Sequence, residues 1–399
     1  MRNVSKLVLA LLLVAAAGLA FAQSAPPAAG ANLTIGLVMV GPYNDHGWSQ
    51  AHYDGMQYVL GKVPGTKLVY IDNANSSSRP GTTPSQLAES LVAQGAKLVC
   101  FSSDDFADEA TKFAQAHKDV FVIMSSGDHV WKDGKNFKNL PNMVNVMGKM
   151  EYMKMVAGVA AAMTTKTGKI GFLGPLINDE TRRLAASAYL GAKYAWVNYR
   201  KMDIKKLEFK VTWIGFWFNI PGVTADPTQV ADDFFNSGYD VVISGIDTTE
   251  AVTEAKKFQA QKKIVWAIPY DYANALAEGK EVSLGVPYFN WGPAYVKNIQ
   301  DAMKGTWASH FEWNGPNWKN INDPDTSAVG FNKGTLDGPS TYAVNKFIGE
   351  LAGGLNLWKG PLNLQDKSAY LKSGEAATDF QIWYLPQLLE GMTGQSVAK

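Results

Sequence analysis

The sequence predicts an α/β protein built from two doubly wound parallel sheets. From Leu33 onward, apolar β-rich runs alternate with segments of helical pattern, and this alternation is typical of parallel sheets covered by helices. The chain has 399 residues. Its strand–helix units number about a dozen, more than one ordinary domain holds, which predicts two such sheets.

Residues 1–22 have the order of a secretory signal peptide. A basic start precedes an apolar run that ends in Ala20-Phe21-Ala22, a small-x-small cleavage site before Gln23. The run is short for a membrane-spanning helix. We therefore expect cleavage near Ala22-Gln23, a flexible leader over residues 23–32, and a periplasmic protein.

Charge and composition exclude several classes of protein. Loss of Arg2 and Lys6 takes the formal net charge from +1 to −1, since residues 1–22 contain no acid. This near-neutral charge gives no basic surface of the kind that binds nucleic acid. Cys100 is the only cysteine and lies in the strand-like run KLVCF. The chain therefore has no disulfide framework and no cysteine at the cleavage site to carry lipid.

The strand–helix units can be followed along the chain. Each expected strand is followed by a short polar loop and a helical pattern. These strands are Leu33–Val40, Lys67–Asp72, Lys97–Ser103, Lys169–Gly174 and Asp240–Gly245.

The chain is expected to pass between the two sheets near Gly148, near Ile264–Ala275 and in the turn-rich segment Asn314–Gly330. The predicted lobes are residues 33–147 plus 271–325, and residues 148–270 plus 326–399. We expect the C-terminal tail to be folded.

Six junctions at the ends of expected strands carry the candidate site. In open parallel sheets, ligands bind at the carboxyl ends of the strands. Nearly every one of these junctions combines an aromatic residue with Asp or Asn. They are PYNDHGW (42–48), SSDDF (102–106), FWFN (216–219), GIDTT (245–249), PYDY (269–272) and YFNWG (288–292).

This combination favours binding of a flat heterocycle. Aromatic faces stack on such rings, and amides and carboxylates hydrogen-bond to ring edges. Sugars also bind between aromatic and acidic residues, so a sugar ligand stays open. The chain has only five arginines, and Arg182–Arg183 read as part of an exposed first helical turn. A phosphate ligand is therefore disfavoured.

Catalytic and cofactor motifs fit the sequence poorly. No G-x-S-x-G elbow or P-loop occurs, and the five histidines are not spaced as metal ligands. We expect no enzyme activity, no cofactor and no metal. The alternative from another class is a periplasmic nucleoside or glycoside hydrolase that uses Asp247 and Asp271 as an acid pair.

Several motifs resemble the basic membrane protein family of ABC-transporter substrate-binding proteins, which includes the purine nucleoside receptor. The opening loop carries its D-x-x-[FW]-[NS]-Q pattern at Asp45, Trp48, Ser49 and Gln50. Further similar segments span residues 33–392. They are EYMKMVAGVAAAMTTKTGKIGFLG, FWFNIPGVTADPTQVADDFFNSGYDVV, WKGPLNLQ and YLPQLLEGM.

The resemblance implies a type I periplasmic-binding-protein fold, with two lobes joined by three crossings that close over a purine base or nucleoside. It also implies an ABC permease in the inner membrane as partner, and we expect a monomer. The ligand-binding positions it implies are Asn44, Asp45, Trp48, Ser103, Phe106, Trp217, Asp247, Asp271 and Trp291. Phe216 or Phe218 could replace Trp217 as the stacking face.

Two features depart from the nucleoside-binding members. The lipidated cysteine is absent, and VPYFNWG (286–292) stands where those members carry a ribose-holding lysine. This second departure favours a free base. We also expect Trp48, as a residue of a loop tip, to contribute little to the core.

Overall fold

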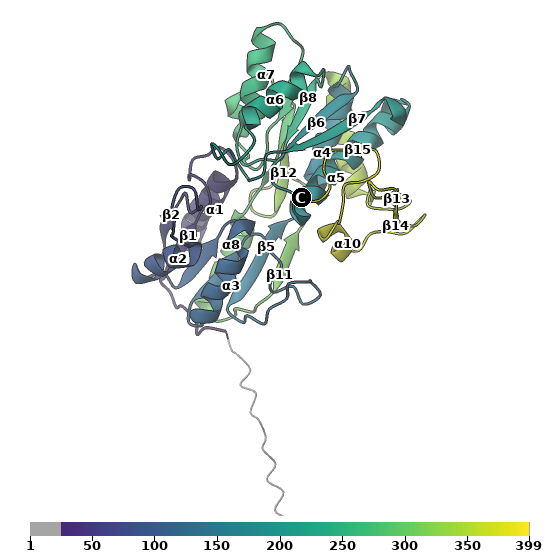
Figure 1. The fold of residues 1–399 in the computed structure, drawn as a ribbon. Helices are drawn as coiled ribbons and strands as arrows, with labels where there is room; N and C mark the ends of the chain where they lie inside the picture. The colour runs from purple at the N-terminus through teal and green to yellow at the C-terminus, as the bar shows by residue number, and fades with distance from the viewer. Residues whose placement is uncertain (1–24, 399) are drawn as a thin grey trace, which may run out of the picture.

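A computed structural model describes residues 25–398. The predicted signal peptide lies outside these residues. Figure 1 shows an elongated molecule with one sheet in each half. Within the described part of the chain, no helix combines the length and apolar character needed to cross a bilayer. Residues 25–32 contain no helix or strand, and the backbone of Ala29 donates a hydrogen bond to Ala302.

The first sheet has six strands, all parallel, in the order β2-β1-β3-β4-β5-β11. Its inner strands are mostly apolar because helices cover both faces. Helix α1 packs on α8, and α2 packs on α3. The bounds are β1 (Leu33–Val38), β2 (Thr66–Ile71), β3 (Leu98–Phe101), β4 (Phe121–Met124), β5 (Met143–Gly148), β11 (Phe311–Asn314), α1 (Trp48–Lys62), α2 (Pro84–Ala93), α3 (Ala107–Ala116) and α8 (Gly292–Lys304).

The second sheet has five parallel strands in the order β15-β7-β6-β8-β9. Helix α4 packs on α5 and α9, and α6 packs on α7. The bounds are β6 (Lys169–Gly174), β7 (Glu208–Trp213), β8 (Val241–Ser244), β9 (Trp266–Ile268), β15 (Met392–Thr393), α4 (Met150–Thr164), α5 (Asp179–Tyr194), α6 (Pro227–Asn236), α7 (Glu250–Ala260) and α9 (Gly338–Ala352).

Helices α4 and α5 approach each other closely at two glycines. A Cβ added to Gly158 would lie 1.9 Å from the carbonyl oxygen of Ala188, and one added to Gly191 would lie 2.0 Å from that of Met155. The two backbones are therefore in contact. This close packing fixes the side chains that α4 and α5 direct toward the space between the lobes.

Three crossings join the lobes. The chain leaves the first sheet after β5 and enters α4, returns from β10 (Gly285–Phe289) into α8, and leaves again between β11 and β12 (Val329–Lys333). Strand β10 pairs with β12 and bridges to the end of β9 at Asp271 and Tyr288. The chain thus stays beside the second sheet as far as Phe289, beyond the segment 264–275 where we expected a crossing. The exact lobe boundaries remain a prediction.

The C-terminal tail is folded against the second lobe. Strand β15 pairs with β7, and α10 (Asp379–Trp383) packs on α5. Between α9 and α10 the chain forms a short antiparallel pair, β13 (Leu362–Asn363) and β14 (Ala369–Leu371). Figure 1 shows this segment beside α5, at the level where the two lobes meet.

Candidate functional site

Two tryptophans from different lobes line one cavity. Trp48 begins α1 in the first lobe, and Trp217 follows β7 in the second. Together with Phe172, Asp247 and Tyr270 they surround a narrow space, of about 10 Å³ in this closed arrangement. An adjoining space shares Trp48, Trp217 and Asp247. Of the three aromatic residues 216–218, Trp217 is the one that lines both spaces.

The lobes touch each other beside this cavity. A Cβ added to Gly47 would lie 1.6 Å from the carbonyl oxygen of Asp247, so the two loops are in direct contact. Side-chain hydrogen bonds also join the lobes. Ser126 Oγ donates to Glu180 Oε2 at 3.0 Å, Asn178 Nδ2 donates to Asp104 Oδ2 at 3.2 Å, and the Tyr384 hydroxyl donates to Asp128. The two lobes are therefore closed against each other.

A buried acid lies beside the cavity at the end of β9. Asp271 is 0% exposed and has a left-handed backbone, with φ of 70°. Neither of its carboxyl oxygens has a partner in hydrogen-bonding geometry within residues 25–398. Such groups are rare in folded proteins because an unpaired buried oxygen costs about 1–3 kcal/mol. Asp271 is therefore suited to accept a hydrogen bond from a ligand N–H.

A lysine from α4 lies near this acid. Lys154 is fully buried, donates from Nζ to the carbonyl oxygen of Ser244 at 2.7 Å, and lies 3.1 Å from the centroid of the Tyr270 ring. Burial lowers the pKa of Lys154 to about 7, while the charge of Asp271 opposes that shift. Burial also raises the pKa of Asp271 well above its usual range, and Lys154 opposes this shift in turn.

The other carboxyl groups of the cavity also have raised pKa values. Burial raises the pKa of Glu180 to about 7 and that of Asp104 to about 6, with the charge of Arg183 acting against both shifts. Burial and the neighbouring charge of Asp271 raise the pKa of Asp247 well above its usual range. The cavity therefore holds several carboxyl groups that can be protonated near neutral pH, and each can then donate as well as accept.

Two further sequence-predicted residues, Ser103 and Asp45, contribute near the cavity in other ways. Ser103 lines the adjoining space and caps a short 3-10 helix by accepting from the backbone of Asp105. The Asp45 carboxylate accepts hydrogen bonds from the backbone N–H groups of Gly47, Ser49 and Gln50, each at 2.9 Å. Asp45 thus fixes the first turn of α1, and with it the position of Trp48.

Three further predicted residues do not line the cavity. Asn44 is exposed on the loop after β1. Phe106 is 0% exposed and packs in the core of the first lobe. Trp291 stacks on the rings of His52 and Phe289, with centroids 4.1 and 4.8 Å away. Its ring meets that of Trp48 edge-on, with the centroids 5.3 Å apart, and so helps to hold Trp48 in place.

Two expectations about single residues were wrong. Trp48 is not at a loop tip: it is 7% exposed, belongs to the core cluster, and donates from Nε1 to the carbonyl oxygen of Ser102 at 2.5 Å. Arg183 is not on an exposed turn: it is 1% exposed and donates from Nε to Glu151 Oε1 at 2.7 Å. In both cases the helix turns the side chain inward, which the loop sequence alone did not reveal.

Sequence reasoning also missed Lys154 and Glu180. The strand-end junctions contain no lysine, but α4 brings Lys154 to the cavity from the second lobe. A signal was present, because Lys154 stands between two methionines in the otherwise apolar run MKMVAGVAAAM. A charge in a helix that is apolar on all sides indicates a buried and paired group.

The geometry and the fold define a class of protein, a two-lobed binding protein that encloses a small ligand. Comparison with known families agrees. Residues 32–315 match the family described as ABC transporter substrate-binding protein, PnrA-like. The chain belongs to this family. Its members bind small ligands, work with ABC permeases and act outside the cytoplasm.

One relative and two solved structures illustrate the similarity. A purine-binding protein of Brucella abortus (strain 2308) is 26% identical over 363 residues, which cover 87% of this chain and 89% of the relative. A solute-binding protein of an ABC transporter system from Aeropyrum pernix K1 has a TM-score of 0.60 at 13% identity, covering 80% of this chain and 86% of that one. Another from Conexibacter woesei has a TM-score of 0.58 at 14% identity, covering 81% and 97%. These structures share the type I periplasmic-binding-protein fold predicted from the sequence.

Proposed function

We propose that this protein captures a purine base or nucleoside between its lobes in the periplasm and delivers it to an ABC permease. The observation that carries the proposal is the cavity in which Trp48 and Trp217 meet from opposite lobes, with Asp247 in its wall and the unpaired carboxyl group of Asp271 beside it. Two aromatic faces suit a flat ring, and buried carboxyl groups suit its N–H edges. The purine-binding relative supports the same ligand class.

The balance of charge around the cavity favours a neutral ligand. The acids Asp104, Glu180, Asp247 and Asp271 outnumber the nearby cations Lys154 and Arg183. Arg183 is already bonded to Glu151, and Lys154 lies against Tyr270 with a lowered pKa. Both cations thus already have protein partners, so a phosphate would enter the cavity without a cation of its own, and burying an unpaired anion is costly. Nucleotides should therefore bind at least a hundredfold more weakly than bases, about 2.7 kcal/mol.

A calorimetric titration series tests the ligand class. Adenine, guanine, hypoxanthine, adenosine, guanosine and AMP are added in turn to ligand-stripped protein. We expect the free bases to bind at least as tightly as the nucleosides and AMP to bind weakly. Tight AMP binding would contradict the charge argument, and a strong preference for nucleosides would show that another group holds the ribose in place of the missing lysine.

The same samples separate the two alternatives. A receptor for a sugar or another small polar solute has the same fold but gives no heat with any purine. A nucleoside or glycoside hydrolase that used Asp247 and Asp271 as an acid pair would release product. We expect adenosine to be recovered unchanged by chromatography after prolonged incubation with the protein.

A further inference from the structure

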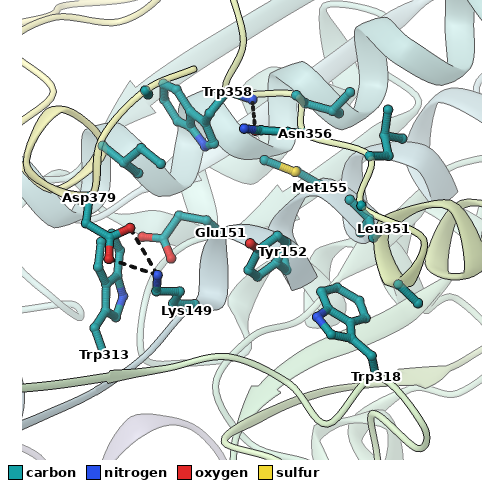
Figure 2. A pocket seen from close by; sticks show the side chains of 16 residues that line it. Lys149, Glu151, Tyr152, Met155, Trp313, Trp318, Leu351, Asn356, Trp358 and Asp379 are labelled. Carbon is teal, nitrogen blue, oxygen red and sulfur yellow. Dashed lines mark hydrogen bonds and ion pairs between the residues drawn. The ribbon is translucent and has the colours of Figure 1, made fainter. Parts of the chain in front are cut away.

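The cavity lined by Trp48 and Trp217 is called the purine cavity below. A second cavity lies at the hinge and is separate from it. It has a volume of about 350 Å³, is open to solvent, and shares no lining residue with the space between Trp48 and Trp217. Figure 2 shows it between the start of α4, the residues after α9 and the start of α10. We call it the hinge cavity.

Most residues that line the hinge cavity are aromatic or apolar, and polar atoms provide about half of its surface. Trp313, Trp318, Trp358 and Tyr152 all line it, and Figure 2 shows them on different sides of the space. Trp358 is 2% exposed and Trp313 is 9% exposed, so both rings are held firmly. Trp318 meets Tyr152 edge-on, with centroids 5.1 Å apart. A concave space of this size with aromatic walls is typical of small-molecule sites.

The charged groups at one end of the cavity are already paired. Lys149 Nζ lies 3.0 Å from Asp379 Oδ1 and 4.8 Å from the centroid of the Trp313 ring. Glu151 Oε1 accepts from Arg183. No net charge is therefore left to bind an ion. Trp313 Nε1 and Glu151 Oε2, in the same wall, have no hydrogen-bond partner within the described chain, which suits a ring with polar edge atoms.

We propose that the hinge cavity binds a small, uncharged aromatic compound and that this binding is coupled to closure of the lobes. The cavity lies where two of the crossings pass the second lobe. Lys149 belongs to the first crossing and Trp318 to the third, Trp313 lies in β11 of the first sheet, and the residues from Leu351 onward belong to the second lobe. Rotation of one lobe against the other must change the distances between these walls. A compound that fits the closed form therefore stabilises closure, and by reciprocity it raises the affinity of the purine cavity.

Indole is a suitable probe for the site, because it is flat, uncharged and has one N–H. Calorimetry should show saturable binding of indole to the exported chain. Ala352→Trp places a bulky ring in the wall of the cavity at an exposed position at the end of α9, and should weaken indole binding at least about tenfold, since it removes space that the ligand needs. Tyr342→Trp adds an exposed indole ring to the same helix away from the cavity and should leave the binding of added indole unchanged. Absence of saturable binding to the unaltered protein, or equal binding to Ala352→Trp, overturns the site.

The coupling is measured by titrating adenine with and without saturating indole. We expect indole to raise the adenine affinity about fivefold or more, and to lose this effect in Ala352→Trp. Unchanged or weakened adenine binding overturns the coupling. This part rests on the proposed function, but the indole titration does not. If no purine binds while indole still does, the proposed function fails and the hinge site stands.

Discussion

Trp48 and Trp217 line the same cavity but differ in what else they contact. Trp48 packs edge-on against His52, Phe289 and Trp291 and belongs to the core cluster of the first lobe. Trp217 is 8% exposed, and neither of the hydrophobic core clusters of the described chain includes it. Residues that line one site can therefore differ in their contribution to stability, which makes Trp217 the cleaner probe of binding.

Substitution of the two tryptophans should separate binding from stability. Trp217→Ala should cost roughly 1–3 kcal/mol of purine binding through lost stacking, with a small change in the free energy of unfolding. Trp48→Ala should lower purine affinity and also destabilise the protein by about 3–5 kcal/mol, as truncation of a buried aromatic does. Calorimetry and urea unfolding measure the two quantities. Unchanged affinity in Trp217→Ala would move the site away from this cavity.

The raised pKa values of the cavity acids make stability depend on pH. The pKa of Glu180 rises from 4.5 to about 7, and that of Asp104 from 3.8 to about 6. Because the folded protein holds more protons than the unfolded chain between these values, the free energy of unfolding should fall as the pH rises from about 4 to about 7. The lowered pKa of Lys154 acts in the opposite direction, but only above about 7.

Glu180→Gln tests this dependence in the ligand-free protein. The variant removes the contribution of Glu180, so unfolding free energies measured in urea at about pH 5 and about pH 7 should differ less than in the unaltered protein. Glu281→Gln changes an exposed acid and serves as the control. An unchanged difference between the two pH values would show that Glu180 titrates normally.

At the scale of the elements, the site is formed where loops of opposite lobes come into contact. Asp45 fixes the start of α1, and Gly47 lies directly against the carbonyl oxygen of Asp247 in the loop after β8. Only a residue without a side chain allows this approach. The contact exists only when the lobes are closed, so it should matter for trapping the ligand more than for folding.

Gly47→Ala should therefore weaken purine binding without unfolding the protein. Its Cβ would lie 1.6 Å from the Asp247 oxygen in the closed form, so closure requires a shift of one loop. We expect a loss of affinity of about tenfold or more, roughly 1.4 kcal/mol, with a nearly unchanged melting temperature in the absence of ligand. Gly61→Ala, in the helix that begins directly after Gly47, meets nothing within 4 Å and should bind normally. Full affinity in Gly47→Ala would show that the loops separate in the bound state.

The elements also show how far the sequence predicts the molecule. Strand β6 occupies the predicted range Lys169–Gly174, and β1, β3 and β8 lie within their predicted runs, because buried parallel strands are continuous apolar segments. Considering the residues at the carboxyl ends of the strands together grouped Trp48, Trp217 and Asp247, which line one cavity. It did not include Lys154, Glu180 or Arg183, because these side chains project from helices and their direction depends on how α4 and α5 pack.

At the scale of the whole molecule, the purine cavity lies between the lobes and the hinge cavity lies at the hinge. The proposed purine cavity is formed where the ends of the strands face each other, and the hinge cavity lies where two crossings pass the C-terminal part of the second lobe. Closure changes both, so the two-lobed architecture offers a way for one small molecule to influence the binding of another. Both cavities depend on the same motion, and the purine cavity carries the central claim.

Native mass spectrometry of the protein as purified tests that claim most directly. A closed site with two stacking rings and buried polar contacts should retain its ligand through gentle purification, and the mass of the adduct identifies it. We predict an adduct with the mass of a purine base or nucleoside, which is lost in Trp217→Ala. An adduct with the mass of a sugar, or a purine adduct that persists unchanged in Trp217→Ala, would contradict the account.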